Sequence, residues 1–348
     1  MASRLTLKIF DMCASMLAPL AAGLARLQWR WGPQNLPRSF RAWNARGVLP
    51  VPFHYYQPVF DADALPSSVW TRESSLAGID LRLEQQLQLL DQFRYCDELR
   101  RFPLHGKSGA GFRYLNGMFG PGDAEILYSV IRHFRPRRMI EIGSGNSTLL
   151  AKAALDLNRA EGHDAEHICI EPYSAPWLEN LGLTQLVRER VETLDPAFFQ
   201  QLDNNDILFI DSSHVVRTGG DVLFEYLEIV PRLRPGVLVH VHDIFFPFEY
   251  PLSWSRDLKW FWTEQYLVQA FLAFNTEFEI VLALNYLNAH RREALARARA
   301  YLRRTARRHA GLVVDTASVR QLVERPSFRG WVVGDSWALT TLYKMIAT

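Results

Sequence analysis

Acidic residues and histidines follow two separate apolar runs of the sequence. In "ILFIDSSH" Asp211 and His214 are three residues apart, and in "VLVHVHD" His242 directly precedes Asp243. An imidazole can accept a proton near neutral pH. Carboxylates and imidazoles also supply the oxygen and nitrogen atoms that bind Mg²⁺ or a softer divalent metal. These residues therefore predict a site for proton transfer, metal binding or both.

A glycine turn in "MIEIGSGNSTLLA" (139–151) indicates a second kind of site. Gly143 and Gly145 follow an apolar run and precede polar residues that can begin a helix, a setting that brings backbone amides close to an electron-rich ligand. A dinucleotide fingerprint would need a third glycine where the chain has Thr148. Glu171 ends the next apolar run and could accept hydrogen bonds from two ribose hydroxyls. The turn therefore predicts a ribose-bearing cofactor.

The elements that must position these side chains alternate between strand and helix. This alternation predicts an α/β fold with a doubly wound, mainly parallel sheet, in which ligands lie beyond the carboxyl ends of the strands. Gly143, Glu171, Asp211 and Asp243 each follow one of the strands, so we expect them to meet at one edge. The expected strands are 138–143, 167–171, 186–191, 207–211, 237–243, 278–284 and 337–344.

Four motifs in combination resemble a known enzyme family. They are "EIGSGNST", "CIEP", "DILFIDSSHVVRTGGDV" and "LRPGVLVHVHDIFFPFEYP". Over residues 110–285 and the last strand, the chain resembles the class I S-adenosylmethionine-dependent methyltransferases, in the branch that contains small-molecule O-methyltransferases. The resemblance implies a Rossmann-like, seven-stranded sheet whose last strand is antiparallel, with S-adenosylmethionine over the carboxyl ends of the first strands.

The resemblance also implies roles for individual residues. Glu141, Gly143 and Gly145 would hold the methionine end of the cofactor, Glu171 the ribose, and the region around Val191 and Glu192 the adenine. The remaining expected cofactor contacts are Ser144, Ser147, Thr148, Pro172 and Asp211.

Methyl transfer to a hydroxyl requires that the oxygen be aligned and its proton removed. We expect His214 to be the catalytic base and Asp211 to orient the site or hold a cation. The expected metal ligands are Asp211, His242 and Asp243. In catechol-type relatives an Asp-Asn pair follows the fifth strand, whereas this chain has Ile244 at the Asn position. Around "DSSH" the chain looks more like macrolide-sugar methyltransferases, which places His242 in an acidic slot, and the metal requirement stays open.

Aromatic residues are dense in 243–254 and 259–267, which predicts an apolar wall for a ring or for one face of a sugar. The alternative for these residues is core packing. The expected substrate is therefore a small-molecule acceptor, a sugar or a natural product.

The chain is expected to contain two parts, a mostly helical or irregular N-terminal extension (1–110) and the methyltransferase domain (111–348). The domain would carry a basic helical insertion at 287–335, either a solvated helix or a contact for an anionic substrate or an acidic membrane surface. The uncharged segment Met12–Ala25 predicts a short buried or interfacial helix that is retained in the mature chain, too short to span a bilayer.

Composition limits the partners. Lys and Arg number 39 against 37 Asp and Glu, so the charge balance predicts no nucleic-acid partner. Three scattered cysteines form neither a disulfide framework nor a zinc motif, which favours a cytoplasmic location. Peripheral membrane contact and a homo-oligomer are both compatible with the sequence. A nicotinamide-dependent oxidoreductase and a non-catalytic cofactor-binding scaffold are the alternative functions.

Overall fold

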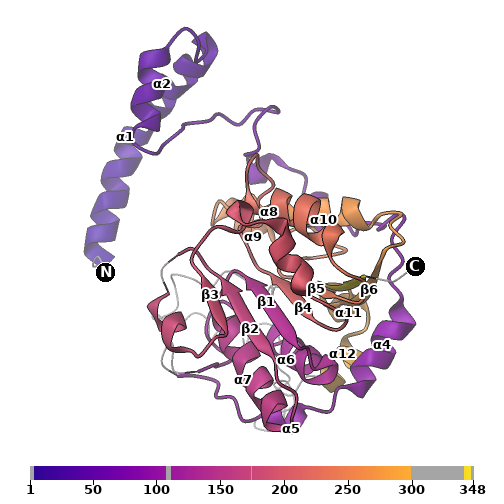
Figure 1. Ribbon diagram of the computed structural model, residues 1–348. Coiled ribbons are helices and arrows are strands. Elements are labelled where there is room, and N and C mark those ends of the chain that lie inside the picture. The colour runs from indigo at the N-terminus through magenta and orange to yellow at the C-terminus, as the bar shows by residue number, and fades with distance from the viewer. Residues whose placement is uncertain (1–3, 107–110, 174, 299–340, 346–348) are drawn as a thin grey trace. The chain divides into compact units, whose positions relative to one another are not determined.

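The computed structural model describes residues 4–106, 111–173, 175–298 and 341–345 (Figure 1). The chain divides into two compact units, Met1–Pro66 and Ser67–Thr348. This division falls at residue 66, whereas the sequence led us to expect a boundary at residue 110. Leu90, Phe93 and Leu99 are buried in the same core as Leu127 of the larger unit, because this stretch packs on the sheet domain rather than on the N-terminal helices.

The N-terminal unit is built on two helices, α1 (Arg4–Trp31) and α2 (Pro37–Asn44). Trp29 packs edge-on against Phe40, with ring centroids 5.6 Å apart, which joins the end of α1 to α2. The helix predicted at Met12–Ala25 is longer than expected and contains no buried residue, so of the two alternatives, buried or interfacial, the buried one does not hold. By length and composition alone, α1 is long and apolar enough to cross a membrane.

A seven-stranded sheet forms the centre of the larger unit, in the order β3-β2-β1-β4-β5-β7-β6. Strands β1 to β5 are parallel, and β7 is antiparallel to both of its neighbours, which confirms the predicted fold class. The strands are β1 (Arg138–Ile142), β2 (Glu166–Ile170), β3 (Gln185–Val187), β4 (Ile207–Ile210), β5 (Leu238–Val241), β6 (Phe278–Ala283) and β7 (Thr341–Met345).

Side-chain alternation along the strands divides the core into two layers. Met139 and Phe209 point into one hydrophobic cluster, while Ile140 and Ile210 point into the other. The first cluster includes residues of α6 (Asp123–Phe134) and α7 (Asn146–Ala160), and the second includes residues of α8 (Asp221–Phe224) and α10 (Glu264–Leu272). In Figure 1 these two pairs of helices lie on opposite faces of the sheet. Both faces of the sheet are therefore covered, as the nearly continuous apolar strands require.

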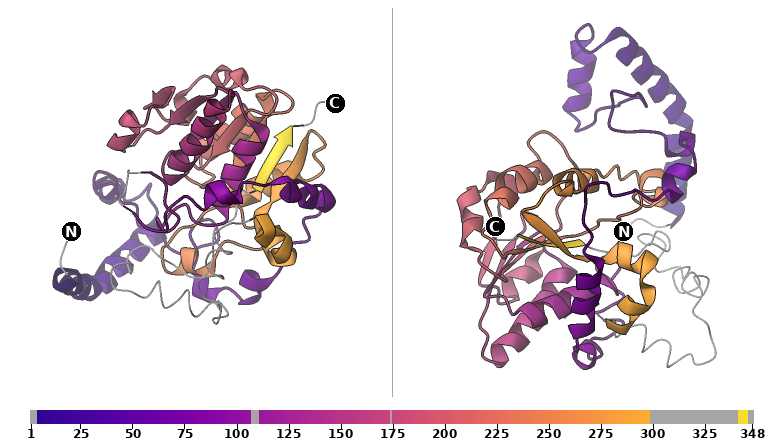
Figure 2. Two further views of the ribbon diagram at one scale, coloured as in Figure 1. Left: turned by 90° about the horizontal axis from the view of Figure 1, so that it is seen from below. Right: turned by 90° about the vertical axis from the view of Figure 1, so that its right-hand side faces the viewer.

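Helices of the larger unit surround this sheet (Figure 2). They are α3 (Ser68–Thr71), α4 (Leu83–Gln92), α5 (Cys96–Leu99), α6 (Asp123–Phe134), α7 (Asn146–Ala160), α8 (Asp221–Phe224), α9 (Leu252–Arg256), α10 (Glu264–Leu272), α11 (Leu284–His290) and α12 (Arg292–Ala298). The described part of the expected basic insertion consists of α11 and α12, separated at Arg291. Its remainder, 299–335, lies outside the described residues.

Candidate active site

Gly143 lies directly after β1, at the point where the chain turns toward α7. Its φ is +83°, and a Cβ at this position would lie 1.9 Å from the carbonyl oxygen of Asp211. Glycine is therefore required by the close approach of β1 and β4. A Cβ on Gly145 would meet no other atom within 4 Å, so the turn borders open space on that side.

Glu141 is fully buried beneath this turn and holds it in place. One of its oxygens accepts a hydrogen bond from the Thr148 hydroxyl (2.8 Å) and lies 3.5 Å from the Ser147 hydroxyl. The other lies 2.6 Å from Nε2 of His167. Thr148 in turn accepts a hydrogen bond from the Gly145 amide (2.9 Å). The structure thus gives Glu141 contacts that fix the turn.

Glu171 reaches the turn from the end of β2. Its carboxylate accepts hydrogen bonds from the amides of Ser144 (3.2 Å) and Tyr173 (2.8 Å), and the side chain remains partly exposed beside Pro172. Val191 begins a short 3₁₀ turn and is buried in the core layer that contains Ile170. The structure therefore brings the glycine turn and Glu171 together and places Val191 in the layer behind β2.

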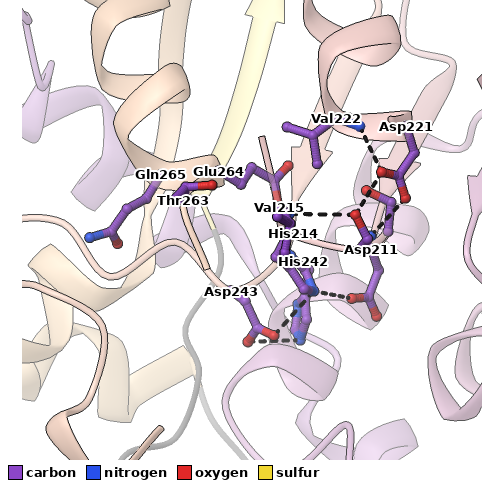
Figure 3. A network of polar contacts seen from close by, with 12 residues as sticks. Asp211, His214, Val215, Asp221, Val222, His242, Asp243, Thr263, Glu264 and Gln265 are labelled. Atoms are coloured by element: carbon purple, nitrogen blue, oxygen red, sulfur yellow. Dashed lines mark hydrogen bonds and ion pairs between the residues drawn. The ribbon is translucent and has the colours of Figure 1, made fainter. Parts of the chain in front are cut away.

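Asp211, His214 and Asp243 form a compact cluster at the ends of β4 and β5 (Figure 3). Nε2 of His214 lies 3.3 Å from a carboxylate oxygen of Asp211 and 3.5 Å from one of Asp243. His214 has a φ of +59° and Asp243 a φ of +56°. Left-handed backbone at such residues is uncommon and is found disproportionately at functional sites. The predicted pair Asp211 and His214 is thus joined by Asp243.

Glu264 also belongs to this site, although the sequence indicated no direction for its side chain or for those of the neighbouring polar residues Gln265 and Tyr266. Glu264 begins α10, is fully buried, and places one carboxylate oxygen 2.7 Å from Nδ1 of His214. Its other oxygen accepts a hydrogen bond from the Tyr226 hydroxyl (2.8 Å). The backbone amides of Thr263 and Glu264 both donate to the carbonyl of His214, which fixes the start of α10 against the cluster. Gln265 points away from it in Figure 3.

The charges in the cluster favour a protonated His214. Burial alone lowers the pKa of this imidazole, but its contacts with Asp211 and Glu264 outweigh that effect and hold the pKa well above its ordinary value. Burial raises the pKa of the Asp211 carboxyl, but the neighbouring imidazoles, above all that of His242, outweigh burial and hold this pKa below its ordinary value. For Asp243 burial is the largest effect, and its pKa is raised.

The structure brings together a different set of possible metal ligands from the expected one. Among the described residues, the ligand atoms that lie within 4.8 Å of one another here belong to Asp211, His214 and Asp243. His242, which the sequence placed in the set, is not in this group. Its Nε2 lies 3.6 Å from Asp243, and its ring packs against Phe119 with centroids 5.0 Å apart.

Aromatic side chains line the cluster on one side. The ring centroids of Trp262 and His214 lie 4.2 Å apart, and Trp260 stacks on Trp262 with ring centroids 5.0 Å apart. Trp254 contacts both tryptophans, and with Phe245 and Tyr250 these rings form a separate hydrophobic cluster. The packing role that the sequence allowed for these stretches is thus observed, and Trp262 also borders the His214 cluster.

The segment of the chain that carries the glycine turn and the ends of β4 and β5 matches a known protein family. A family model described as a methyltransferase domain matches residues 140–244, from β1 through the glycine turn to Asp243. An uncharacterized protein of Archaeoglobus fulgidus is 31% identical over 177 residues, which cover 46% of this chain and 77% of that protein.

Two solved structures are similar over 56% of this chain. The O-methyltransferase TomG from Streptomyces achromogenes, in complex with S-adenosylmethionine, is 16% identical with a TM-score of 0.30 over 81% of its chain. An O-methyltransferase from Bacillus cereus, in complex with S-adenosylhomocysteine, is 13% identical with a TM-score of 0.29 over 82% of its chain. The family model covers the glycine turn and the ends of β1, β2, β4 and β5, and this chain belongs to the class I S-adenosylmethionine-dependent methyltransferases.

Proposed function

We propose that the protein transfers a methyl group to a hydroxyl oxygen of a small molecule, with His214 as the catalytic base. The observation that carries this proposal is the environment of His214, whose Nε2 faces Asp211 and Asp243 while its Nδ1 is held by buried Glu264. A carboxylate on Nδ1 orients an imidazole and stabilises the charge it gains on accepting a proton.

The glycine turn and Glu171 fit the cofactor of the family. Gly145 leaves open space beside the backbone, and Glu171 is partly exposed at the end of β2. We assign the methionine end to the turn from Gly143 to Thr148, the ribose to Glu171 and Pro172, and the adenine to the region of Val191. S-adenosylmethionine supplies an electrophilic methyl group when bound.

The chain's own residues would then prepare the acceptor oxygen. His214 must first release its resting proton, because its contacts with Asp211 and Glu264 favour the charged form. The neutral Nε2 then takes the proton of the acceptor hydroxyl. Asp211 and Asp243, which lie beside Nε2, stabilise the positive charge that the ring gains. The Trp262 ring beside His214 excludes water from one side. Together, carboxylates and an aromatic wall suit a sugar or a hydroxylated ring.

A mechanism that uses a divalent metal ion is the second candidate, and the state of one buried oxygen atom favours it. Oδ1 of Asp243 is buried and makes no hydrogen bond among the described residues. Asp211, His214 and Asp243 would hold the ion, which would lower the pKa of an acceptor hydroxyl. A carboxylate on the far nitrogen, as Glu264 provides, is also usual for a metal-bound imidazole. Nε2 cannot bind a metal and accept a proton together, so the two candidates exclude each other.

The test is mass spectrometry of hydroxylated acceptors incubated with methyl-labelled S-adenosylmethionine, with and without EDTA. The base mechanism predicts a labelled O-methyl product that forms equally well in EDTA. Loss of product in EDTA and its return with Mg²⁺ or Mn²⁺ would replace it with the metal mechanism. Cofactor binding without turnover on sugars, phenols and aliphatic alcohols would favour the scaffold alternative.

A further inference from the structure

Helix α1 exposes one continuous apolar side. At about 100° per residue, nine of the eleven exposed large apolar residues of α1 fall within an arc of about 140°, and the other two, Phe10 and Leu7, lie between this arc and the charged side. Each of the nine is between 42 and 75% exposed. They are Leu5, Ile9, Met12, Met16, Leu17, Leu20, Leu24, Leu27 and Trp31.

The opposite side of α1 is polar and basic. Arg4, Lys8, Asp11, Ser15 and Arg26 fall within an arc of about 60°. Arg30, in the last turn, lies at the edge of the apolar arc instead. Asp11 is the sole acidic residue of the helix sequence, against four basic ones. A helix with separate apolar and basic sides is suited to the boundary between acyl chains and anionic headgroups.

The contacts of α1 within its own unit leave the apolar side uncovered. Gln28 accepts a hydrogen bond from the Trp43 indole (3.0 Å), and Trp29 packs against Phe40. Gln28 and Trp29 flank the side of α1 that carries Ala25, away from Leu20 and Leu27. Helix α2 therefore packs beside the basic side rather than over the apolar one.

The charge of the whole N-terminal unit is also one-sided. Residues 1–66 contain seven basic and three acidic residues, and no acidic residue occurs from 12 to 60, where five arginines do. The unit is thus net +4, whereas the complete chain is +2. Anionic lipid headgroups complement such a charge, and each added Lys or Arg near the surface strengthens the attraction.

We propose that α1 lies in the plane of an anionic lipid bilayer, with its apolar side in the acyl region and its basic side toward the headgroups. A spanning helix would fit less well. Although the whole helix is long enough to cross a bilayer, its uncharged stretch Met12–Ala25 covers only about 21 Å at 1.5 Å per residue, short of the roughly 30 Å hydrocarbon core. Asp11 and Ser15 on the basic side would also enter that core, whereas the in-plane orientation keeps them at its surface.

Vesicle sedimentation with the full chain tests the lipid partner. We expect the protein to bind phosphatidylglycerol-containing vesicles, to bind pure phosphatidylcholine more weakly, and to dissociate as NaCl is raised. The double variant Leu17→Gln/Leu20→Gln should bind at least about tenfold more weakly. Its matched control, Ala18→Gln/Ala22→Gln on the basic side, should bind nearly as wild type. No vesicle binding, or equal loss in both variants, would overturn the proposal.

Cysteine labelling distinguishes the two orientations. In a Cys13→Ser background bound to vesicles, a membrane-impermeant maleimide should react at Ser15→Cys and Ala18→Cys above the level set by the remaining cysteines. Met16→Cys and Leu20→Cys should be protected. A spanning helix would protect all four positions and would contradict the in-plane orientation. Unchanged S-adenosylmethionine binding in each variant confirms that the methyltransferase unit is folded.

Discussion

Nδ1 of His214 lies 2.7 Å from a carboxylate oxygen of Glu264, which is fifty residues further along the chain. This contact turns Nε2 toward Asp211 and Asp243, so it determines which nitrogen meets a ligand. It also stabilises a positive charge on the ring. The orientation and the protonation state of the imidazole therefore both depend on the start of α10.

Replacing Glu264 tests this dependence. We expect Glu264→Gln to lower turnover about tenfold to a hundredfold, the usual effect of losing a carboxylate that orients a functional imidazole. The midpoint of the pH profile of kcat/KM should also move to lower pH, since the amide no longer favours the charged ring. Tyr226→Phe, which removes the other hydrogen bond of Glu264, is the control and should have the smaller effect. A Gln variant with an unchanged midpoint would remove Glu264 from this role.

The raised pKa of His214 predicts opposite pH trends for activity and stability. Activity should rise with pH at values above about 6.5, because the base must be neutral to accept a proton. The stability that the charged ring contributes is fully present below its unfolded pKa of about 6.5 and is lost as pH rises through the folded pKa.

Urea unfolding at several pH values measures this second trend, with His214→Ala as the control that lacks the contribution. The free energy of unfolding should fall more steeply on the alkaline side for wild type than for the alanine variant. Parallel curves for the two proteins would show that His214 is not charged in the folded state.

Gly143 and Gly145 should respond differently to substitution. Gly143→Ala should lower the free energy of unfolding by more than about 2 kcal/mol, because its Cβ would collide with the Asp211 carbonyl at a positive φ. Gly145→Val places its side chain in open space and should leave that free energy within about 1 kcal/mol of wild type. Its S-adenosylmethionine affinity should fall at least tenfold by calorimetry. Normal affinity in the valine variant would place the methionine end elsewhere.

The sheet and its functional edge could be predicted from the sequence because both depend on local patterns. Apolar runs marked the strands, and Gly143, Glu171, Asp211 and Asp243 marked their carboxyl ends. Parallel pairing brings such ends to one edge, so no knowledge of distant contacts was needed. Strand 186–191 was expected to be longer than the observed Gln185–Val187. Beyond its end, the Arg188 side chain donates hydrogen bonds to the carbonyls of Glu171 and Tyr173.

Features that depend on long-range contacts could not be predicted in this way. Glu264 stands among aromatic residues in "KWFWTEQYL", and its direction follows from the hydrogen bonds of the Thr263 and Glu264 amides to His214. From the sequence, His242 was the expected metal ligand because it adjoins Asp243. In the structure, His214 has a left-handed backbone, and its Nε2 lies between the carboxylates of Asp211 and Asp243. The observed division at Pro66 reflects the burial of Leu90 and Leu99 in the core cluster that contains residues of α6.

The most direct test compares labelled methyl transfer to a hydroxylated acceptor by wild type and by His214→Ala, in EDTA and at saturating S-adenosylmethionine. The proposed mechanism predicts an O-methyl product from wild type and a turnover about two to four orders of magnitude lower in the variant. Cofactor affinity should be the same in both proteins. Equal turnover, or a methyl group found on nitrogen or carbon, would contradict it.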